Sequence, residues 1–185
     1  TDTQKLAAYA AQNAGGIVGL GKTFDASSYL ASHEDLLKAF GSDTVRAKSH
    51  FFEFGVDESR SLDSFDEKSY LASYSDLLAA FGKDTTKATT HYSEFGFGEG
   101  REVDTFDDLG YIASYSDLII AFGTDKAQAV DHYINFGYTE NRSVTFDAKS
   151  YLAGYSDLRT AFGTNEELAK QHYIEHGFNE GRVIA

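Results

Sequence analysis

Cysteine, proline, methionine and tryptophan are all absent from this chain of 185 residues. Without cysteine there is no disulfide, no thiolate zinc site and no cysteine nucleophile. Proline usually makes up about 5% of a globular protein, so its absence favours many short helices over loops shaped by proline. No apolar run approaches the roughly 18 residues that a membrane span needs. Because the chain begins at Thr1 and has no methionine, we expect a processed product or a fragment of a longer protein.

Positive charge is scarce. The chain has 16 lysines and arginines against 29 aspartates and glutamates, which gives a net charge of −13 and a pI near 4.7. An acidic surface repels phosphate backbones and anionic lipids, so nucleic acid is not an expected partner. With 42% hydrophobic residues the chain should fold rather than stay disordered. Acidity without cysteine suits a protein kept soluble outside a bacterial cell, although many cytosolic proteins share both features.

One unit of about 40 residues, repeated four times, fills most of the chain. Its aligned first residues are Phe24, Phe65, Phe106 and Phe146. The steps between these phenylalanines are 41, 41 and 40 residues. We therefore divide the chain into an N-terminal segment and repeats 1 to 4, with the ranges 1–23, 24–64, 65–105, 106–145 and 146–185.

Each repeat is predicted to begin with two short helices. In repeat 2, Asp66 stands at an N-cap position before Tyr70 and Leu71, which follow at helical spacing. A second helix is expected to start at Ser75 and to carry apolar residues up to Phe81. The glycine that follows recurs in every copy, at Gly41, Gly82, Gly123 and Gly163. Glycine directly after a helix is the usual left-handed stop.

A third helix is predicted after a polar N-cap residue. The expected caps are Asp43, Asp84, Asp125 and Asn165. In repeat 1 its apolar face is predicted to contain Ala47, Phe51 and Phe54. A glycine followed by an apolar residue indicates a Schellman stop. The glycines in question are Gly55, Gly96, Gly137 and Gly177.

The repeats are not expected to fold as independent domains. The connection from Arg60 to Phe65 is too short for a free linker, and a unit of about 40 residues without a disulfide or metal rarely folds alone. Neighbouring copies must bury each other's faces. The sequence therefore predicts an all-α, solenoid-like stack of four repeats with about three short helices each. A helix from Lys5 to Gln12 is expected to cap repeat 1, before a glycine-rich connector at 15–21.

The two end copies depart from the pattern. His33 replaces the tyrosine of the other copies at its position, and His176 replaces a phenylalanine. Terminal repeats lack one neighbour, so a more polar residue there is less unfavourable.

A histidine followed by an aromatic residue recurs in every repeat. The four histidines are His50, His91, His132 and His172. They could bind a ligand or metal, but a metal site needs several ligands within bonding distance. We favour half-buried imidazoles that are bonded to a carboxylate or a carbonyl between helices.

An arginine follows a glutamate by two residues near the end of every repeat. The four arginines are Arg60, Arg101, Arg142 and Arg182. A row of arginines could hold anionic groups such as sulfated or uronic sugars. We favour pairing with a carboxylate that holds one repeat to another, and the candidate carboxylates are Asp35, Asp76, Asp117 and Asp157.

Aromatic and acidic residues supply two further candidates. Most phenylalanines and tyrosines recur at helical spacing and are expected in the core, although one tyrosine per repeat could present its hydroxyl along an edge. These tyrosines are Tyr29, Tyr70, Tyr111 and Tyr151. Asp104, Asp107 and Asp108 could bind calcium weakly, but we favour a solvated helix start.

Enzyme signatures are not found. Residues Gly16 to Thr23 match the phosphate-loop pattern, but no buried strand precedes them, so we favour a flexible glycine connector. No G-x-S-x-G elbow occurs, and His33-Glu34 lacks the second histidine of a zinc-protease motif because Leu37 stands there. We therefore predict that the chain is not an enzyme and has no cofactor.

The repeat frame runs Tyr-Leu-Ala-Ser-Tyr-Ser-Asp-Leu, then Ala-Phe-Gly, His-Tyr and Gly-x-x-Glu-Gly-Arg. It resembles the tandem repeats with a His-Tyr … Glu-Gly-Arg ending found in large bacterial proteins. Many of those are exported or surface proteins of the calcium-repeat (RTX) secretion type. The resemblance covers residues 24–185 and implies an accessory array in a larger exported protein. Two copies depart from it, since Ser59 and Asn141 replace the last glycine, and the calcium-binding nonapeptides are absent.

We therefore expect a non-enzymatic repeat module of an extracellular or cell-surface bacterial protein, acting as a spacer or a self-assembling scaffold. Its partner would be another protein or a second copy of the chain. The alternative is a carbohydrate-binding module that uses exposed tyrosines and arginines to recognise anionic glycans. A third hypothesis, an enzyme, requires a cleft unique to one copy.

Overall fold

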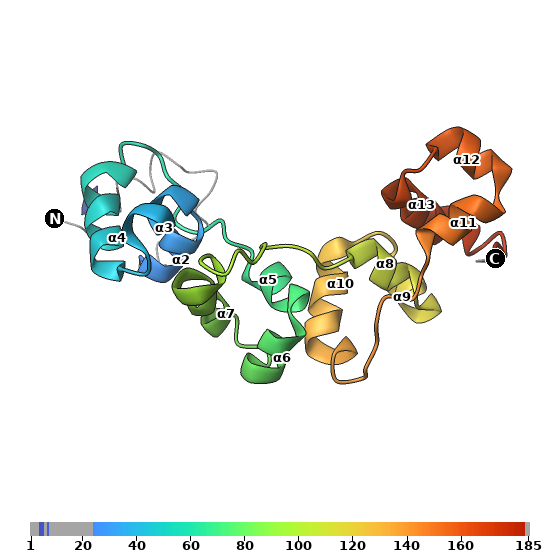
Figure 1. Cartoon of the computed structure of the whole chain (residues 1–185), viewed down its shortest axis with the longest axis horizontal. Coiled ribbons are helices and arrows are strands. Elements are labelled where there is room, and N and C mark those ends of the chain that lie inside the picture. The colour runs from blue at the N-terminus through green and yellow to red at the C-terminus, as the bar shows by residue number, and fades with distance from the viewer. Residues whose placement is uncertain (1–3, 6, 8–23, 184–185) are drawn as a thin grey trace. The chain divides into compact units, whose positions relative to one another are not determined.

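The computed structural model describes residues 4, 5, 7 and 24–183, and every regular element in them is helical (Figure 1). Each repeat has three short α-helices followed by a π-helical turn. Repeat 1 contains α2 (Ala26–Ala31), α3 (Glu34–Phe40), α4 (Thr44–His50) and η1 (Phe51–Gly55). Repeat 2 contains α5 (Glu67–Ser73), α6 (Ser75–Phe81), α7 (Thr85–His91) and η2 (Tyr92–Gly96). Repeat 3 contains α8 (Asp108–Ala113), α9 (Ser116–Phe122), α10 (Lys126–His132) and η3 (Tyr133–Gly137). Repeat 4 contains α11 (Ala148–Gly154), α12 (Ser156–Phe162), α13 (Glu166–His172) and η4 (Tyr173–Gly177).

The predicted all-α array of four repeats, with three short helices in each, is confirmed. The predicted N-terminal helix, apart from isolated positions, and the glycine-rich connector lie outside the described residues. The same holds for the phosphate-loop match at 16–23.

The third helix begins at a side-chain cap in every repeat, as predicted. The carboxylate of Asp43 accepts two first-turn amides, each at 3.0 Å. Asp84, Asp125 and Asn165 each accept one amide of their own first turn at 3.1 Å. These bonds satisfy donors that have no partner inside a helix.

The second helix is followed by a glycine with positive φ in every repeat, as predicted, but this glycine does not adopt the left-handed helical conformation expected of the usual stop. Gly41 has φ 59° and ψ −136°. The amide of Asp43 donates to the carbonyl of Phe40 at 3.3 Å, which closes a turn with the geometry of type II′ around Gly41. Side chains rarely tolerate this backbone conformation, so glycine is required here.

The glycine predicted to stop the third helix does not adopt the positive φ of a Schellman stop. It is the last residue of a π-helical turn that continues the third helix, and the residue with positive φ comes four positions later. The residues with positive φ are Ser59, Gly100, Asn141 and Gly181. A Cβ on Gly55 would lie 2.6 Å from the hydroxyl of Tyr29, and one on Gly137 would lie 2.0 Å from that of Tyr111. The predicted Schellman stop was wrong because close approach of a buried tyrosine, not helix termination, requires these glycines.

The core of each repeat is built around its first helix. The tyrosine of that helix is fully buried in all four copies, at Tyr29, Tyr70, Tyr111 and Tyr151. An alanine on the third helix is fully buried as well, and its small side chain lets the helices approach closely. These alanines are Ala47, Ala88, Ala129 and Ala169.

The described chain forms two compact units. One contains the described residues up to Glu67 together with Asp84–Val103, and the other contains Lys68–Lys83 together with Asp104 onward. In the first unit α2 packs against α7 and η2, and in the second unit α8 packs against α13 and η4. In both units the first helix of one repeat receives the third helix of the next repeat.

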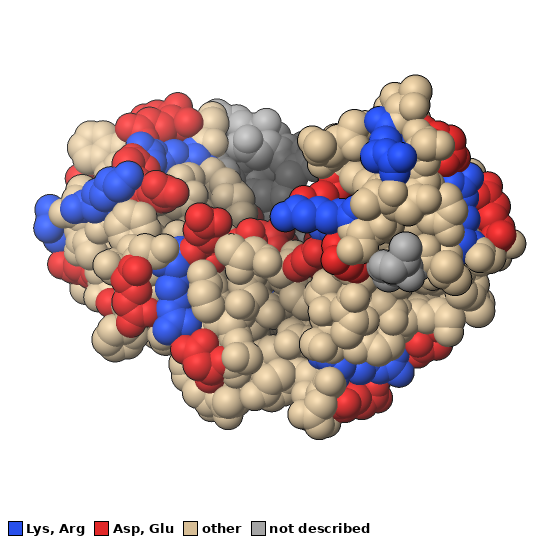
Figure 2. All heavy atoms as spheres, turned by 45° about the vertical axis from the view of Figure 1, so that its right-hand side comes forward, with Lys and Arg blue, Asp and Glu red and all other residues tan. Residues whose placement is uncertain are grey.

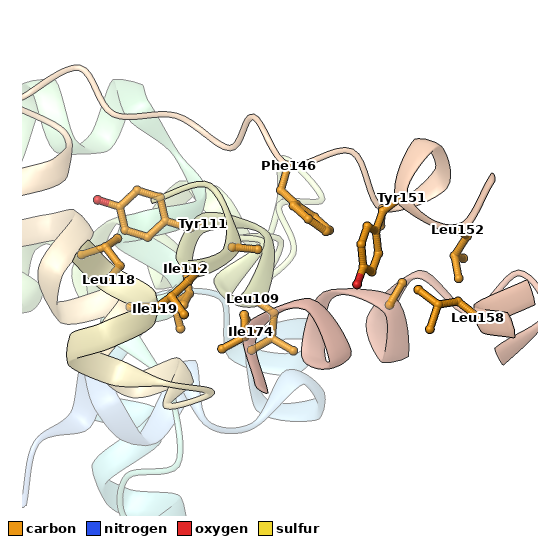
Figure 3. Close-up of a cluster of buried hydrophobic side chains, with 14 residues drawn as sticks. Leu109, Tyr111, Ile112, Leu118, Ile119, Phe146, Tyr151, Leu152, Leu158 and Ile174 are labelled. Atoms are coloured by element: carbon orange, nitrogen blue, oxygen red, sulfur yellow. The ribbon is translucent and has the colours of Figure 1, made fainter. Parts of the chain in front are cut away.

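Polar contacts follow the same relationship between repeats. In the second unit Lys170 donates to the carboxylate of Asp107 at 2.8 Å, and Lys68 donates to that of Asp131 at 2.7 Å. Apolar packing is seen around Ile174 of η4, which lies with Leu109 of α8 in one buried cluster (Figure 3). Ile119 of α9 belongs to the same cluster. We call the surface formed by the first helix, which receives the next repeat, and by the second helix beside it the stacking face.

Candidate functional site

The recurrent histidines are bonded to the buried tyrosines. Nδ1 of the histidine lies 3.1 Å from the tyrosine hydroxyl in the pair Tyr29–His50, 2.9 Å in Tyr111–His132 and 3.0 Å in Tyr151–His172. Each pair links the first helix of a repeat to the end of its third helix. These imidazoles are half-buried and hydrogen-bonded between helices, as the sequence predicted, but the partner is a tyrosine hydroxyl and not the predicted carboxylate or carbonyl.

Aromatic rings surround each imidazole. In repeat 3 the ring of His132 lies 5.7 Å from that of Phe122 and 5.6 Å from that of Phe136. In repeat 2 the ring of His91 lies 5.7 Å from that of Phe95. Burial lowers the pKa of His132 and of His172, because an apolar surrounding disfavours the charged imidazolium.

The histidines do not come together as a metal centre. Each bonded histidine has its own tyrosine, 21 residues earlier in the same repeat. In the described part of the chain, no group of three or more histidine, aspartate or glutamate side chains is placed to hold a metal ion.

The recurrent arginines pair with the predicted carboxylates, but within one repeat. Arg60 lies 2.8 Å from Asp35, Arg142 lies 2.8 Å from Asp117, and in repeat 4 the corresponding distance from Arg182 to Asp157 is 2.9 Å. Each pair spans 25 residues of a single repeat. The expectation that these pairs hold one repeat to another was therefore wrong.

Each of these arginines also contacts the glutamate two residues before it. The distance is 2.5 Å for Glu58 and Arg60, and 2.6 Å for Glu99 and Arg101. On the surface shown in Figure 2, blue basic side chains lie next to red acidic ones. The paired arginine lowers the pKa of its aspartate, as at Asp117, because the guanidinium stabilises the charged carboxylate.

The four tyrosines considered as an edge of hydroxyls are instead fully buried. The most exposed recurrent rings are Phe54, Phe95 and Phe136, which are 54%, 55% and 55% exposed. Phe54 had been assigned to a buried helix face with Ala47 and Phe51. The π-helical turn adds a residue per turn and rotates Phe54 outward, while Ala47 and Phe51 are fully buried.

The sequence did contain a signal for these exposed rings. The ring stands four residues after each histidine and directly before the π-turn glycine, and in repeat 4 its position is taken by the polar His176. A position that accepts histidine in place of phenylalanine is seldom buried in a core.

The acidic cluster of repeat 3 is partly buried rather than fully solvated. Asp107 caps α8 by accepting the amide of Gly110 at 2.9 Å. Oδ1 of Asp108 is buried and has no hydrogen-bond partner. Burial, followed by the charge of nearby Asp104, raises the pKa of Asp108 to about 6. The cluster is a site of unfavourable charge, and the structure groups no metal ligands there.

No family model matches this chain, and no curated protein or solved structure is significantly similar to it. None of the helices in the described residues has the length and apolar character required to cross a membrane.

Proposed function

We propose that the chain is a structural and interaction module, a spacer or scaffold of stacked repeats, in an extracellular or cell-surface bacterial protein. One observation carries this proposal. The recurrent histidines and arginines make the same internal bonds in repeats 1, 3 and 4, as the pairs Tyr111–His132 and Arg142–Asp117 illustrate. These residues recur because each repeat needs the same bonds to hold its own helices together, since buried polar groups need partners. Their recurrence therefore does not require a ligand.

An in-register deletion tests the modular construction. Removing residues 65–105 would place α10 against α2, where α7 packs now, because both third helices occupy the same position in their repeats. We expect a folded, cooperative protein with a lower melting temperature and a maximum dimension, measured by small-angle X-ray scattering, that is one repeat shorter.

A deletion that is not a whole number of repeats is the control. Removing residues 85–105 takes away α7 and η2 and leaves the first two helices of repeat 2 without a third helix, so we expect loss of cooperative unfolding. An unfolded product from the in-register deletion, or equal behaviour of the two deletions, contradicts a modular array.

Export is supported by the resemblance of the repeat frame to exported bacterial arrays and by an acidic, cysteine-free composition. Fractionation of the source cells with an antibody against this chain tests it. We expect the chain in the medium or on protease-accessible cell surfaces. Recovery with a cytosolic marker alone contradicts an extracellular location.

A carbohydrate-binding module is the second candidate, favoured by the three exposed phenylalanine rings. Sugar rings pack against exposed aromatic faces, and Lys83 lies 5.6 Å from the centre of the Phe136 ring, where it could contact an acidic sugar. The test is binding to neutral, uronic and sulfated polysaccharides. Replacing Phe54, Phe95 and Phe136 by alanine should abolish binding, and no binding by the unaltered chain rejects this candidate.

A further inference from the structure

Repeats 1, 2 and 3 share two features on their stacking faces. The second helix contributes a buried aliphatic side chain in each of them. These residues are Leu37, Leu78 and Ile119, which are 3%, 3% and 7% exposed. The first helix is followed or ended by a serine whose hydroxyl receives the backbone that leads into the next repeat. These serines are Ser32, Ser73 and Ser114.

The serine contact is the same at each junction between repeats. The hydroxyl of Ser114 accepts the amides of Thr145 and Phe146 at 2.8 and 3.0 Å. That of Ser73 accepts the equivalent amides of Thr105 and Phe106 at 2.8 and 3.1 Å. One hydroxyl therefore holds two backbone donors at the start of the following repeat.

Repeat 4 departs at both positions. Arg159 stands where Ile119 does in repeat 3, and Gly154 stands where Ser114 does. Both residues are exposed.

The guanidinium of Arg159 lies over the end of α11. It donates to the carbonyl of Leu152 at 3.1 Å and also to the carbonyl of Ala153. The corresponding end of α8 is where Ser114 receives the next repeat. In repeat 4 the same region is occupied by a charged group that is bonded to the helix itself.

A further repeat could not use this face as the others do. It would cover the guanidinium of Arg159, and desolvating a charge is far more unfavourable than burying isoleucine. It would also leave two amides without the hydroxyl acceptor that Gly154 lacks. Both changes act against the same contact.

We propose that repeat 4 closes the stack, because Gly154 and Arg159 prevent its α11–α12 face from receiving the third helix of another repeat or of a second copy of this chain. Soluble repeat arrays need such polar outer faces on a terminal repeat. The inference goes beyond the proposed function and narrows it, since a scaffold that self-associates must then use a different face.

The test appends a second copy of residues 146–185 after residue 185, which preserves the 40-residue step from Phe146. One version keeps repeat 4 unchanged, and the other restores its stacking face with Gly154→Ser and Arg159→Ile. We expect protease to remove the appended repeat at least about tenfold more slowly from the restored version, because a stacked repeat opens less often.

Thr160→Ile is the matched control. It adds an apolar residue next to Arg159, at the position where Ile120 is already 77% exposed in repeat 3, so it should give no protection. Equal protection of the appended repeat with and without the restoring substitutions overturns the proposal. Equal lack of protection overturns it as well, because Gly154 and Arg159 then do not decide stacking.

Two further measurements keep the test interpretable. The 185-residue chain with both restoring substitutions should keep its helical circular dichroism and melting temperature. Arg159→Leu alone, which places the residue of repeats 1 and 2 at this position, should give intermediate protection. The deletion of residues 65–105 tests the modular array independently. A negative result with the appended repeat would therefore reject the closing role of repeat 4 without rejecting the proposed function.

Discussion

The hydroxyl of Tyr111 on α8 and Nδ1 of His132 at the end of α10 are hydrogen-bonded, 2.9 Å apart. Burial raises the pKa of Tyr111 and lowers that of His132, so both groups are uncharged at neutral pH. The bond joins the first and third helices of repeat 3 across 21 residues. This hydrogen bond holds the first and third helices of the repeat together.

Removing the Tyr111 hydroxyl should destabilise the protein. Tyr111→Phe leaves a half-buried imidazole nitrogen without its partner, so we expect a loss of about 1 to 2 kcal/mol in the free energy of unfolding measured in urea. Tyr138→Phe is the control, because phenylalanine already stands at its position in repeats 2 and 4. A loss of equal size in both variants would show that this bond contributes nothing specific.

Gly137→Ala should be strongly destabilising because its Cβ would lie 2.0 Å from the Tyr111 hydroxyl. Such a clash typically costs about 1 to 3 kcal/mol or more. Adding Tyr111→Phe should recover part of the loss, since the nearest clashing atom is then gone. Gly98→Ala is the control, because its Cβ would only approach the Phe95 carbonyl at 3.4 Å. Strict additivity in the double variant would contradict the close approach.

Arg142→Ala should reduce stability in a way that depends on pH. Arg142 lowers the pKa of Asp117, so the pair stabilises the fold above the ordinary aspartate pKa and loses this effect as pH falls through the lowered value. Because Asp117 is more than half exposed, we expect only about 0.5 to 1 kcal/mol at pH 7.

The measurement is urea unfolding of both proteins from pH 7 to pH 2. The difference between wild type and Arg142→Ala should shrink below pH 4. Lys38→Ala, which removes a well-exposed ion pair with Glu34, should change stability by less. A difference that stays constant with pH would show that Arg142 acts through packing on the Tyr115 ring instead.

Asp108→Asn should stabilise the protein at neutral pH. The pKa of Asp108 is raised to about 6, so its charged form is disfavoured in the folded state and the penalty disappears as pH falls from about 6 toward 4. We expect a gain of about 1 to 2 kcal/mol at pH 7, after allowance for partial exposure, and none at pH 4.

Thermal unfolding at both pH values checks this prediction. Asp57→Asn, which removes the charge of an exposed aspartate in repeat 1, should have little effect at either pH. A loss of stability in Asp108→Asn at pH 7 would contradict an unfavourable carboxylate, and would indicate a favourable contact of its charge with Lys126.

Features that depend on neighbouring residues could be predicted from the sequence. Asp43 and Gly41 act on backbone within a few residues of themselves, and both do what their residue types indicate. The partners Asp35 and Arg60 were also named, because each repeat offers the same two charges. That this pair closes its own repeat could not be foreseen, since the distance between residues 25 apart depends on how three helices pack.

The sequence by itself determined the period, the helical class, the caps of the third helix and the glycine that follows the second helix, because these follow from local backbone preferences and from repetition. Tertiary structure decided the rest. The π-helical turn exposes Phe54, and the buried hydroxyl of Tyr29 requires Gly55. The tertiary structure also shows that Arg159 bonds to the end of α11, at a position where the other repeats bury an aliphatic side chain. Each of these depends on which atoms meet across helices, and chain spacing alone does not specify that.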